Sequence, residues 1–262
     1  MKKIWIRIYS TYGLLIFAGV LICLYPFFLL MMIRKSWLKY ALFLNQIWAR
    51  AFLTLSFIPP IQEWRTKLKP GQNYLLVGNH SSFLDIVLMG YVPKPCVFVG
   101  KVSLAKVPIF GYMFKKLHIT VDRRNPRSRY QVLKRGAEVL EKGYSLVMFP
   151  EGGIRSDNPP ELATFRNGAF KLAIEKGVPI VPVTYPHNWK IQPGNHKMLM
   201  YPQRPRMIIH EAIETKDMDV KDANALRDRV FHTIQEELSK YYPNLALKHA
   251  ESFHEKNAAS RI

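Results

Sequence analysis

Residues 74–85 read Tyr74-Leu-Leu-Val-Gly-Asn-His-Ser-Ser-Phe-Leu-Asp85. A short apolar run ends in a glycine, a polar loop follows, and a second apolar pattern begins at Phe83. This order is typical of a buried strand that a tight loop joins to a helix. It predicts an α/β fold in which polar residues lie at the carboxyl end of a strand, where such folds place their sites.

The same alternation continues from Glu63 to about residue 247. Runs typical of strands are 74–77, 96–99, 119–121, 145–149, 180–184 and 207–210, and helical patterns lie at about 83–90, 108–117, 127–142, 167–176 and 221–240. Short continuous apolar runs bounded by turn residues favour a buried, mainly parallel sheet. We therefore predict an α/β domain over 63–247, with a mixed, mainly parallel sheet flanked by helices, and a polar C-terminal tail over 248–262.

His80 and Asp85 are the first candidates for chemistry. On one regular helix, five residues turn about 500° and leave the two side chains ~140° apart, so they pair only if His80 lies in the loop and Asp85 in the first helical turn. In a catalytic interpretation His80 is a general base that Asp85 orients. In a structural interpretation His80 is a surface loop histidine, and Ser82-x-x-Asp85 is a capping box in which Asp85 accepts a backbone N–H.

A second candidate site follows the strand at 145–149, where the chain reads Phe149-Pro-Glu-Gly-Gly-Ile-Arg-Ser156. Two glycines allow backbone N–H groups to approach a ligand, and Arg155 offers a fork of donors that suits a phosphate. An ordinary turn with a solvated arginine is the alternative. The spacing of a Walker phosphate-binding loop is absent.

The first 62 residues differ in composition from the rest. Glu63 is the first acidic residue, and the 26 residues between Arg7 and Arg34 carry no charge. The apolar stretch 12–33 would span ~33 Å as a helix, enough for a ~30 Å hydrocarbon core. The segment 37–61 is apolar at helical spacing but carries Asn45, Gln46 and Arg50, which favours an interfacial helix or one packed on the domain. We predict a membrane-associated helix hairpin over 1–62.

Composition limits the class of protein. Of the 262 residues, 48% are hydrophobic, which excludes a disordered chain, and Cys23 and Cys96 alone cannot form a disulfide scaffold or a four-thiolate zinc site. No histidine spacing typical of a metal site occurs, so no metal is predicted. The net charge of +19 indicates an anionic partner: nucleic acid, an anionic membrane or an acidic protein.

Several ordered motifs resemble one known family. Asn79-His80 with Asp85, followed by Phe149-Pro150-Glu151-Gly152, resembles the glycerolipid acyltransferases of the 1-acylglycerol-3-phosphate acyltransferase type. The segments 100–123, 165–170 and 178–183 resemble further blocks of that family, in order and at its spacings. The family's third block usually reads Glu-Gly-Thr-Arg-Ser, whereas residues 151–156 are one residue longer and lack the threonine.

The resemblance implies transfer of a fatty acyl group from a thioester to the sn-2 hydroxyl of 1-acylglycerol-3-phosphate. It assigns His80 and Asp85 to catalysis and the following residues to substrate binding: Lys101, Arg123, Glu151, Gly152, Gly153 and Arg155. Lys101, Arg123 and Arg155 are phosphate ligands, and Glu151 positions the polar head or its cations. The apolar strand 178–183 either lines an acyl tunnel or packs in the core.

The same resemblance implies no cofactor, with acyl-CoA or acyl carrier protein as co-substrate. It implies a lysophospholipid acceptor, an anionic membrane rather than nucleic acid as partner, and an active site on the cytoplasmic face of the inner membrane. The altered third block leaves other acceptors open, namely glycerol-3-phosphate or a lyso-aminolipid, and the charge leaves a nucleic-acid-binding protein as a remote alternative.

Overall fold

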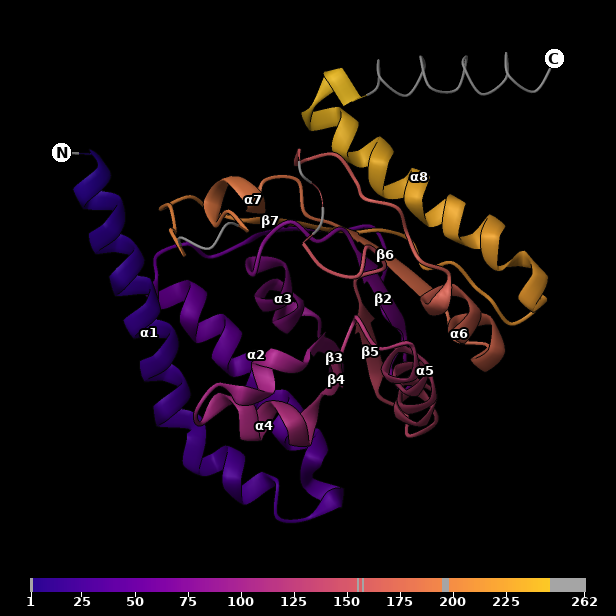
Figure 1. The fold of residues 1–262 in the computed structure, drawn as a ribbon, viewed down its shortest axis with the longest axis horizontal. Helices are drawn as coiled ribbons and strands as arrows, with labels where there is room; N and C mark the ends of the chain where they lie inside the picture. Colours follow the sequence, from indigo (N-terminus) through magenta and orange to yellow (C-terminus); the bar gives the residue numbers. More distant parts are fainter. Residues whose placement is uncertain (1, 155, 157, 195–197, 246–262) are drawn as a thin grey trace.

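The computed structural model describes residues 2–154, 156, 158–194 and 198–245. Arg155 and the predicted tail over 248–262 lie outside the described residues. The chain begins with a hairpin of two helices, α1 (Lys2–Met31) and α2 (Leu38–Leu55), which lies beside an α/β domain (Figure 1).

A seven-stranded sheet forms the centre of the domain, in the order β1-β7-β6-β2-β5-β3-β4. The five strands from β6 to β4 are mutually parallel, whereas β7 is antiparallel to β6 and parallel to β1. The strands are β1 (Ile61–Trp64), β2 (Leu75–Gly78), β3 (Cys96–Lys101), β4 (Ile119–Val121), β5 (Ser145–Met148), β6 (Ile180–Thr184) and β7 (Arg206–Ile209). The predicted mixed, mainly parallel sheet is confirmed.

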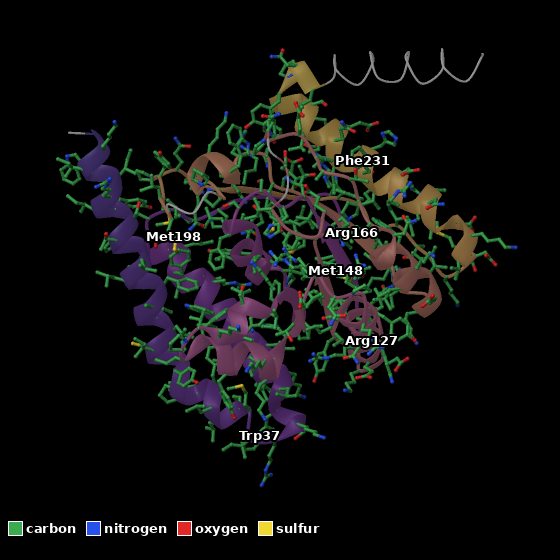
Figure 2. All side chains as sticks on the ribbon, in the orientation of Figure 1. Trp37, Arg127, Met148, Arg166, Met198 and Phe231 are labelled. Carbon is green, nitrogen blue, oxygen red and sulfur yellow. The ribbon has the colours of Figure 1, made fainter. Side chains whose placement is uncertain are left out.

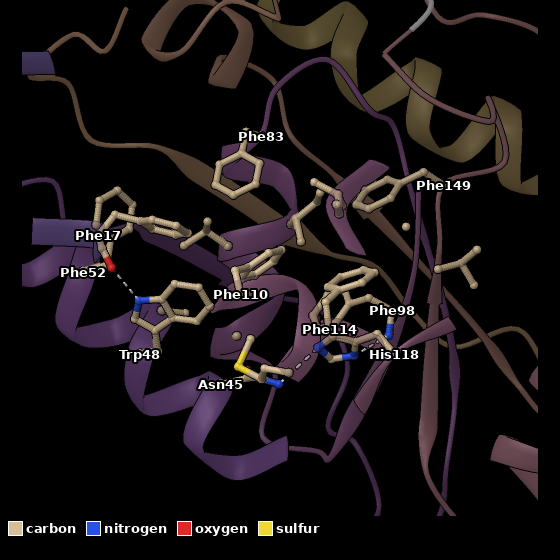
Figure 3. A pocket seen from close by; sticks show the side chains of 18 residues that line it. Phe17, Asn45, Trp48, Phe52, Phe83, Phe98, Phe110, Phe114, His118 and Phe149 are labelled. Atoms are coloured by element: carbon tan, nitrogen blue, oxygen red, sulfur yellow. Dashed lines mark hydrogen bonds between the residues drawn. The ribbon is translucent and has the colours of Figure 1, made fainter. Parts of the chain in front are cut away.

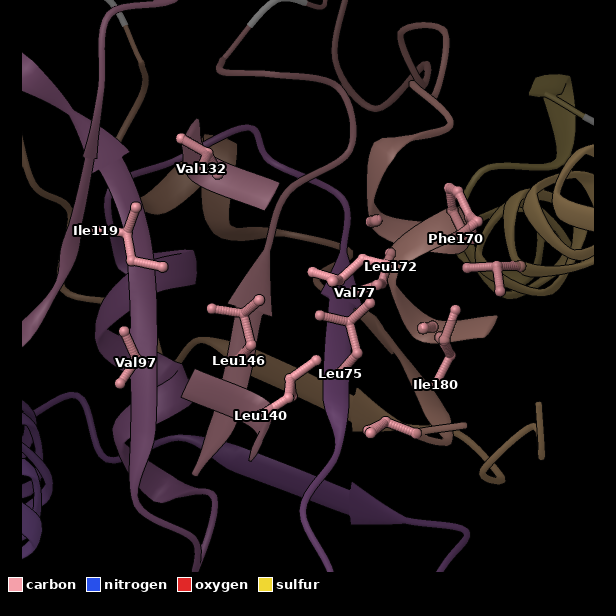
Figure 4. Close-up of a cluster of buried hydrophobic side chains, with 14 of the residues drawn as sticks. Leu75, Val77, Val97, Ile119, Val132, Leu140, Leu146, Phe170, Leu172 and Ile180 are labelled. Atoms are coloured by element: carbon pink, nitrogen blue, oxygen red, sulfur yellow. The ribbon is translucent and has the colours of Figure 1, made fainter. Parts of the chain in front are cut away.

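Alternate residues of each central strand pack on opposite faces. Leu75 and Val77 of β2 join a cluster with α5, α6 and α8 (Figure 4), whereas Leu76 packs with α2 and α3. The helices of the domain are α3 (Leu84–Leu88), α4 (Phe110–Leu117), α5 (Pro126–Glu141), α6 (Gly168–Lys176), α7 (Asn188–Ile191) and α8 (Ala223–Tyr241). Helices on both faces explain why the central strands are apolar throughout.

The six strands expected from the sequence are all present, with bounds that differ by at most two residues. The edge strand β1 was not expected, and it crosses the boundary predicted between residues 62 and 63. Only alternate residues of β1 are half-buried, because it has a single partner, β7. The short helix α7 was not expected either, since four residues give no readable helical period.

The helix α1 contacts the rest of the protein along most of its length. Ser10 Oγ accepts the N–H of Met200 at 2.9 Å, Trp48 Nε1 donates to Phe17 O at 3.0 Å, and Tyr25 Oη donates to Ile109 O at 3.2 Å. The opposite side of α1 is apolar and exposed, and the segment Lys3–Met31 is long and apolar enough to cross a membrane. In α2, Trp48 and Leu53 are buried whereas Phe43 and Ile47 are exposed, so this helix does pack on the domain.

The topology brings three loops to one edge of the sheet. Because β2, β5 and β6 are parallel neighbours, their carboxyl ends lie side by side. The loops that follow these strands contain residues 79–83, 149–154 and 185–187. Residues more than 100 positions apart therefore meet at the edge where open α/β sheets hold their sites.

Candidate active site

Asn79 fastens the loop after β2 to the loop after β6. Its Nδ2 donates to Tyr185 O at 3.1 Å, and its Oδ1 accepts the N–H of Tyr185 at 2.8 Å. Gly78 permits this close approach, because a Cβ there would lie 3.0 Å from the Tyr185 ring. These two hydrogen bonds hold the start of the loop in place, and with it the backbone of His80.

Asp85 is the centre of the hydrogen bonds in this loop, and its side chain is fully buried. Its Oδ2 accepts the N–H groups of Ser81 and Ser82, both at 2.8 Å, and lies 3.1 Å from His80 Nδ1. Its Oδ1 accepts from Asn188 Nδ2 at 2.8 Å. The capping interpretation and the pairing with His80 are thus both present in one carboxylate.

His80 lies in the loop, as the pairing requires, and its ring stacks on Phe149 with centroids 4.2 Å apart. Because a carboxylate only accepts hydrogen bonds, the ring proton lies on Nδ1, facing Asp85, and Nε2 keeps its lone pair. Among the described residues, none forms a hydrogen bond with Nε2. The arrangement can accept a proton at Nε2 and stabilise the resulting imidazolium through Asp85.

Glu151 is bound to the backbone of two loops. Its carboxylate is buried, Oε1 accepts the N–H of His80 at 2.7 Å, and Oε2 accepts the N–H of Ala163 at 3.0 Å. Burial raises the pKa of this carboxyl to about 7, although the two N–H groups act in the opposite direction. Because Oε1 accepts the backbone N–H of His80, Glu151 positions His80.

Gly152 and Gly153 make room for two guanidinium groups. Both have positive φ angles, +77° and +145°, which favour glycine. A Cβ on Gly153 would collide with the guanidinium of Arg123, and one on Gly152 would lie 3.2 Å from Arg166 Nε. The absence of a side chain at these two glycines therefore leaves room for the guanidinium groups of Arg123 and Arg166.

Arg123 and Arg166 line what we term the cationic cavity, of about 260 Å³. Arg129, Phe149, Pro150 and Gly152 also line it, and Figure 2 labels Arg166 and the neighbouring Met148. Planar guanidinium groups match the geometry of a phosphate. Sequence reasoning missed Arg166, although it lies in the segment 165–170 that supported the resemblance.

Lys101 is not brought to this cavity. It is the last residue of β3, pairs with Val121 across the sheet and has an exposed side chain. It is not among the residues that line the cationic cavity. The structure therefore gives no support to Lys101 as a phosphate ligand, and Arg155 lies outside the described residues.

An apolar cavity of about 80 Å³ lies between the helix hairpin, α4 and β3 (Figure 3). Its aromatic lining consists mainly of Phe17, Trp48, Phe52, Phe83, Phe110 and Phe149. Figure 3 shows Asn45 and His118 at the end opposite Phe83. Burial lowers the pKa of His118 to about 3, so this end is uncharged. The strand β6 is buried in the core and does not line the cavity, which decides between the two interpretations of 178–183.

Comparisons with known proteins agree with this geometry. A family model described as Acyltransferase matches residues 62–186. The chloroplastic 1-acyl-sn-glycerol-3-phosphate acyltransferase of Arabidopsis thaliana is 36% identical over 145 residues, which are 55% of this chain and 40% of that protein. Residues 62–186 are thus similar to the acyltransferase family. It spans about half the length of the curated relatives that it matches first.

Two further likenesses bear on the α/β domain. A lyso-ornithine lipid O-acyltransferase of Pseudomonas aeruginosa is 34% identical over 114 residues, which are 44% of this chain and 43% of that protein. The crystal structure of a 1-acyl-sn-glycerophosphate acyltransferase from Thermotoga maritima superposes with a TM-score of 0.76 at 23% identity, over 92% of this chain and 98% of that one. The latter establishes the fold, hairpin included.

Glu151 gives the protein a measurable pH dependence. Since its pKa is raised from 4.5 to about 7, the folded protein binds this proton more tightly than the unfolded chain does. Its contribution to stability is therefore complete below about pH 4.5 and declines as the pH rises through about 7. We expect the melting temperature of the wild type, relative to that of Glu151→Gln, to fall between about pH 5 and 8 in detergent solution.

The exposed Glu175 supplies the control, because Glu175→Gln removes an equivalent charge at the surface of α6. The difference in melting temperature between Glu175→Gln and the wild type should stay nearly constant over the same pH range. If the difference in melting temperature between the wild type and Glu151→Gln does not change with pH, or changes in the opposite direction, the burial of this carboxyl is contradicted.

Proposed function

We propose that this protein transfers a fatty acyl group from an acyl thioester to the sn-2 hydroxyl of 1-acylglycerol-3-phosphate, giving phosphatidate. The observation that supports this most is the position of Phe149. Its ring stacks on His80 and lines both the apolar cavity and the cationic cavity. The candidate base thus lies where an apolar chain site and a phosphate site meet.

In the proposed reaction, His80 Nε2 removes the proton from the sn-2 hydroxyl as its oxygen attacks the thioester carbon. Asp85 holds the ring in orientation and stabilises the imidazolium. The tetrahedral intermediate collapses, the C–S bond breaks, and the proton on Nε2 passes to the leaving thiolate. The hydroxyl attacks directly, so no acyl-enzyme forms and His80 returns to its starting state.

The acceptor's phosphate is assigned to the cationic cavity, with Arg123 and Arg166 as ligands. Arg155 is a third proposed ligand on the resemblance alone. The part of the donor's acyl chain next to the thioester is assigned to the apolar cavity, whose lining is almost entirely aromatic and aliphatic. The reaction needs no cofactor beyond the thioester co-substrate, acyl-CoA or acyl carrier protein.

Another acceptor is the second candidate, because the lyso-ornithine lipid O-acyltransferase is 34% identical. The arginines at the cationic cavity favour a phosphate over an aminolipid head group. Glycerol-3-phosphate carries the same phosphate but no acyl chain, so an assay with all three acceptors separates the candidates.

The hairpin is proposed to hold the enzyme at an anionic membrane, with the site on the cytoplasmic face of the inner membrane. Large apolar side chains of both helices are exposed, among them Trp5, Leu15, Phe27 and Phe43. Because α1 contacts the domain from Ser10 to Tyr25, the membrane must meet the domain along that length. This favours insertion at the interface rather than a free span, with basic residues attracted to anionic lipid.

Loss of the base tests the reaction. We expect His80→Ala to lower kcat by about 10²–10⁴-fold, measured as radiolabelled phosphatidate formed from lysophosphatidate with either thioester donor. His232→Ala is the matched control, because this histidine is exposed on α8. Equal melting temperatures would show that the fold is intact, and equal product from His80→Ala and wild type would remove His80 from the mechanism.

Loss of a phosphate ligand tests the acceptor. Since a hydrogen bond to a charged group contributes about 1.5–3 kcal/mol, Arg123→Gln should raise the KM for lysophosphatidate about 10–100-fold. The KM for the thioester should hardly change. Arg124→Gln removes the same charge from an exposed neighbour. The same KM in both variants would show that Arg123 does not bind the acceptor.

A further inference from the structure

A second large cavity lies along α1, and we term it the α1 groove. It has a volume of about 780 Å³, within the range of ligand sites. It is lined by Leu14 and Phe17 of α1, Phe83 of the His80 loop, Ile154 of the third block, and Met198 and Met200. It adjoins the apolar cavity at Phe17, Phe52 and Phe83, and no part of a substrate has been assigned to it above.

The wall of the groove is fixed by specific contacts. Ser10 Oγ accepts the N–H of Met200 at 2.9 Å, and Gly13 lets the Met200 side chain lie directly against α1. Gly194 has a comparable role, because a Cβ there would collide with Ile154 and lie 3.3 Å from Ser81 O. The groove therefore reaches from the start of α1 to the loop that carries His80.

The groove and the cationic cavity are lined by residues of the third block that are two positions apart in the sequence. Gly152 lines the cationic cavity, whereas Ile154 lines the groove. Two residues span at most ~7 Å. One molecule can therefore place a phosphate against the arginines and an apolar chain in the groove. Ile154 lies in the part of the block that is one residue longer than usual, so the longer block contributes a side chain to the groove.

The groove also matches one acyl chain in length and exposure. From Arg7 to Phe17, both of which line it, α1 rises ~15 Å. This is half of the ~30 Å hydrocarbon core, the depth of one leaflet. Leu14 is 53% exposed and Met198, labelled in Figure 2, is 62% exposed, so the groove opens on the apolar face of the hairpin. The apolar cavity adjoins the groove, because Phe17, Phe52 and Phe83 line both.

We propose that the α1 groove binds the acyl chain already present on the lysophospholipid acceptor, and that Leu14 and Ile154 determine which chain is accepted. This inference rests on the proposed function. A lipid acceptor enters from the bilayer by lateral movement, so its acyl chain needs a binding site that is open along the whole chain. The donor chain arrives on a water-soluble carrier and is assigned to the adjoining apolar cavity.

The test fills the groove and follows acceptor and donor separately. Leu14→Trp is expected to raise the KM for lysophosphatidate with a 16-carbon chain at least tenfold, and that for a 6-carbon chain less than twofold. The preference for donor chain length should stay unchanged. Leu15→Trp is the matched control, because Leu15 is the next residue of α1, is 66% exposed and does not line the groove. Equal effects of the two variants, or a changed donor preference, would overturn the proposal.

A second measurement does not depend on turnover. Lysophosphatidate with a diazirine in its acyl chain would be photolysed with the full protein and the labelled peptides identified by mass spectrometry. Label on α1 and residues 152–154 supports the groove, whereas label on α4 overturns it. If the wild type makes no phosphatidate, the proposed function fails, and this label still decides whether the groove binds a lysolipid chain.

Discussion

The carboxylate of Asp85 is the interaction on which the rest of the site depends. It accepts hydrogen bonds from two backbone N–H groups and from Asn188, and faces His80 Nδ1. A buried carboxylate costs several kcal/mol unless its lone pairs are satisfied, and here the fold supplies all of the donors. The same bonds begin α3 and attach the β2 loop to α7. The orientation of His80 is thus a consequence of how the loop is made stable.

The third block contributes to all three cavities around His80. Phe149 lies between the apolar and cationic cavities, Gly152 and Gly153 admit the guanidinium groups, and Ile154 faces the α1 groove. Glu151 fastens this block to the backbone of His80. Each cavity then receives one part of the two proposed substrates: the donor chain, the acceptor phosphate and the acceptor chain.

The sequence predicted the fold class, because apolar runs and turn residues are local patterns, whereas the catalytic pairing of His80 with Asp85 was chosen over the capping box through the family resemblance. The partner Asn188 could not be predicted, since its contact depends on β6 lying beside β2, 100 residues away along the chain. The backbone partners of Glu151 could not be predicted for the same reason, because they belong to distant loops. Lys101 is the last residue of the parallel strand β3, but its side chain is exposed.

We infer that Asp85 acts on the reaction through His80. A double-mutant cycle separates this from an independent effect, with kcat measured for wild type, Asp85→Asn, His80→Ala and the double variant at matched folding. We expect Asp85→Asn to lower kcat by about 10²–10⁴-fold in the wild type, and by less than about threefold once His80 is absent, because residues that act as one unit are not additive. An equal loss in both backgrounds would contradict it.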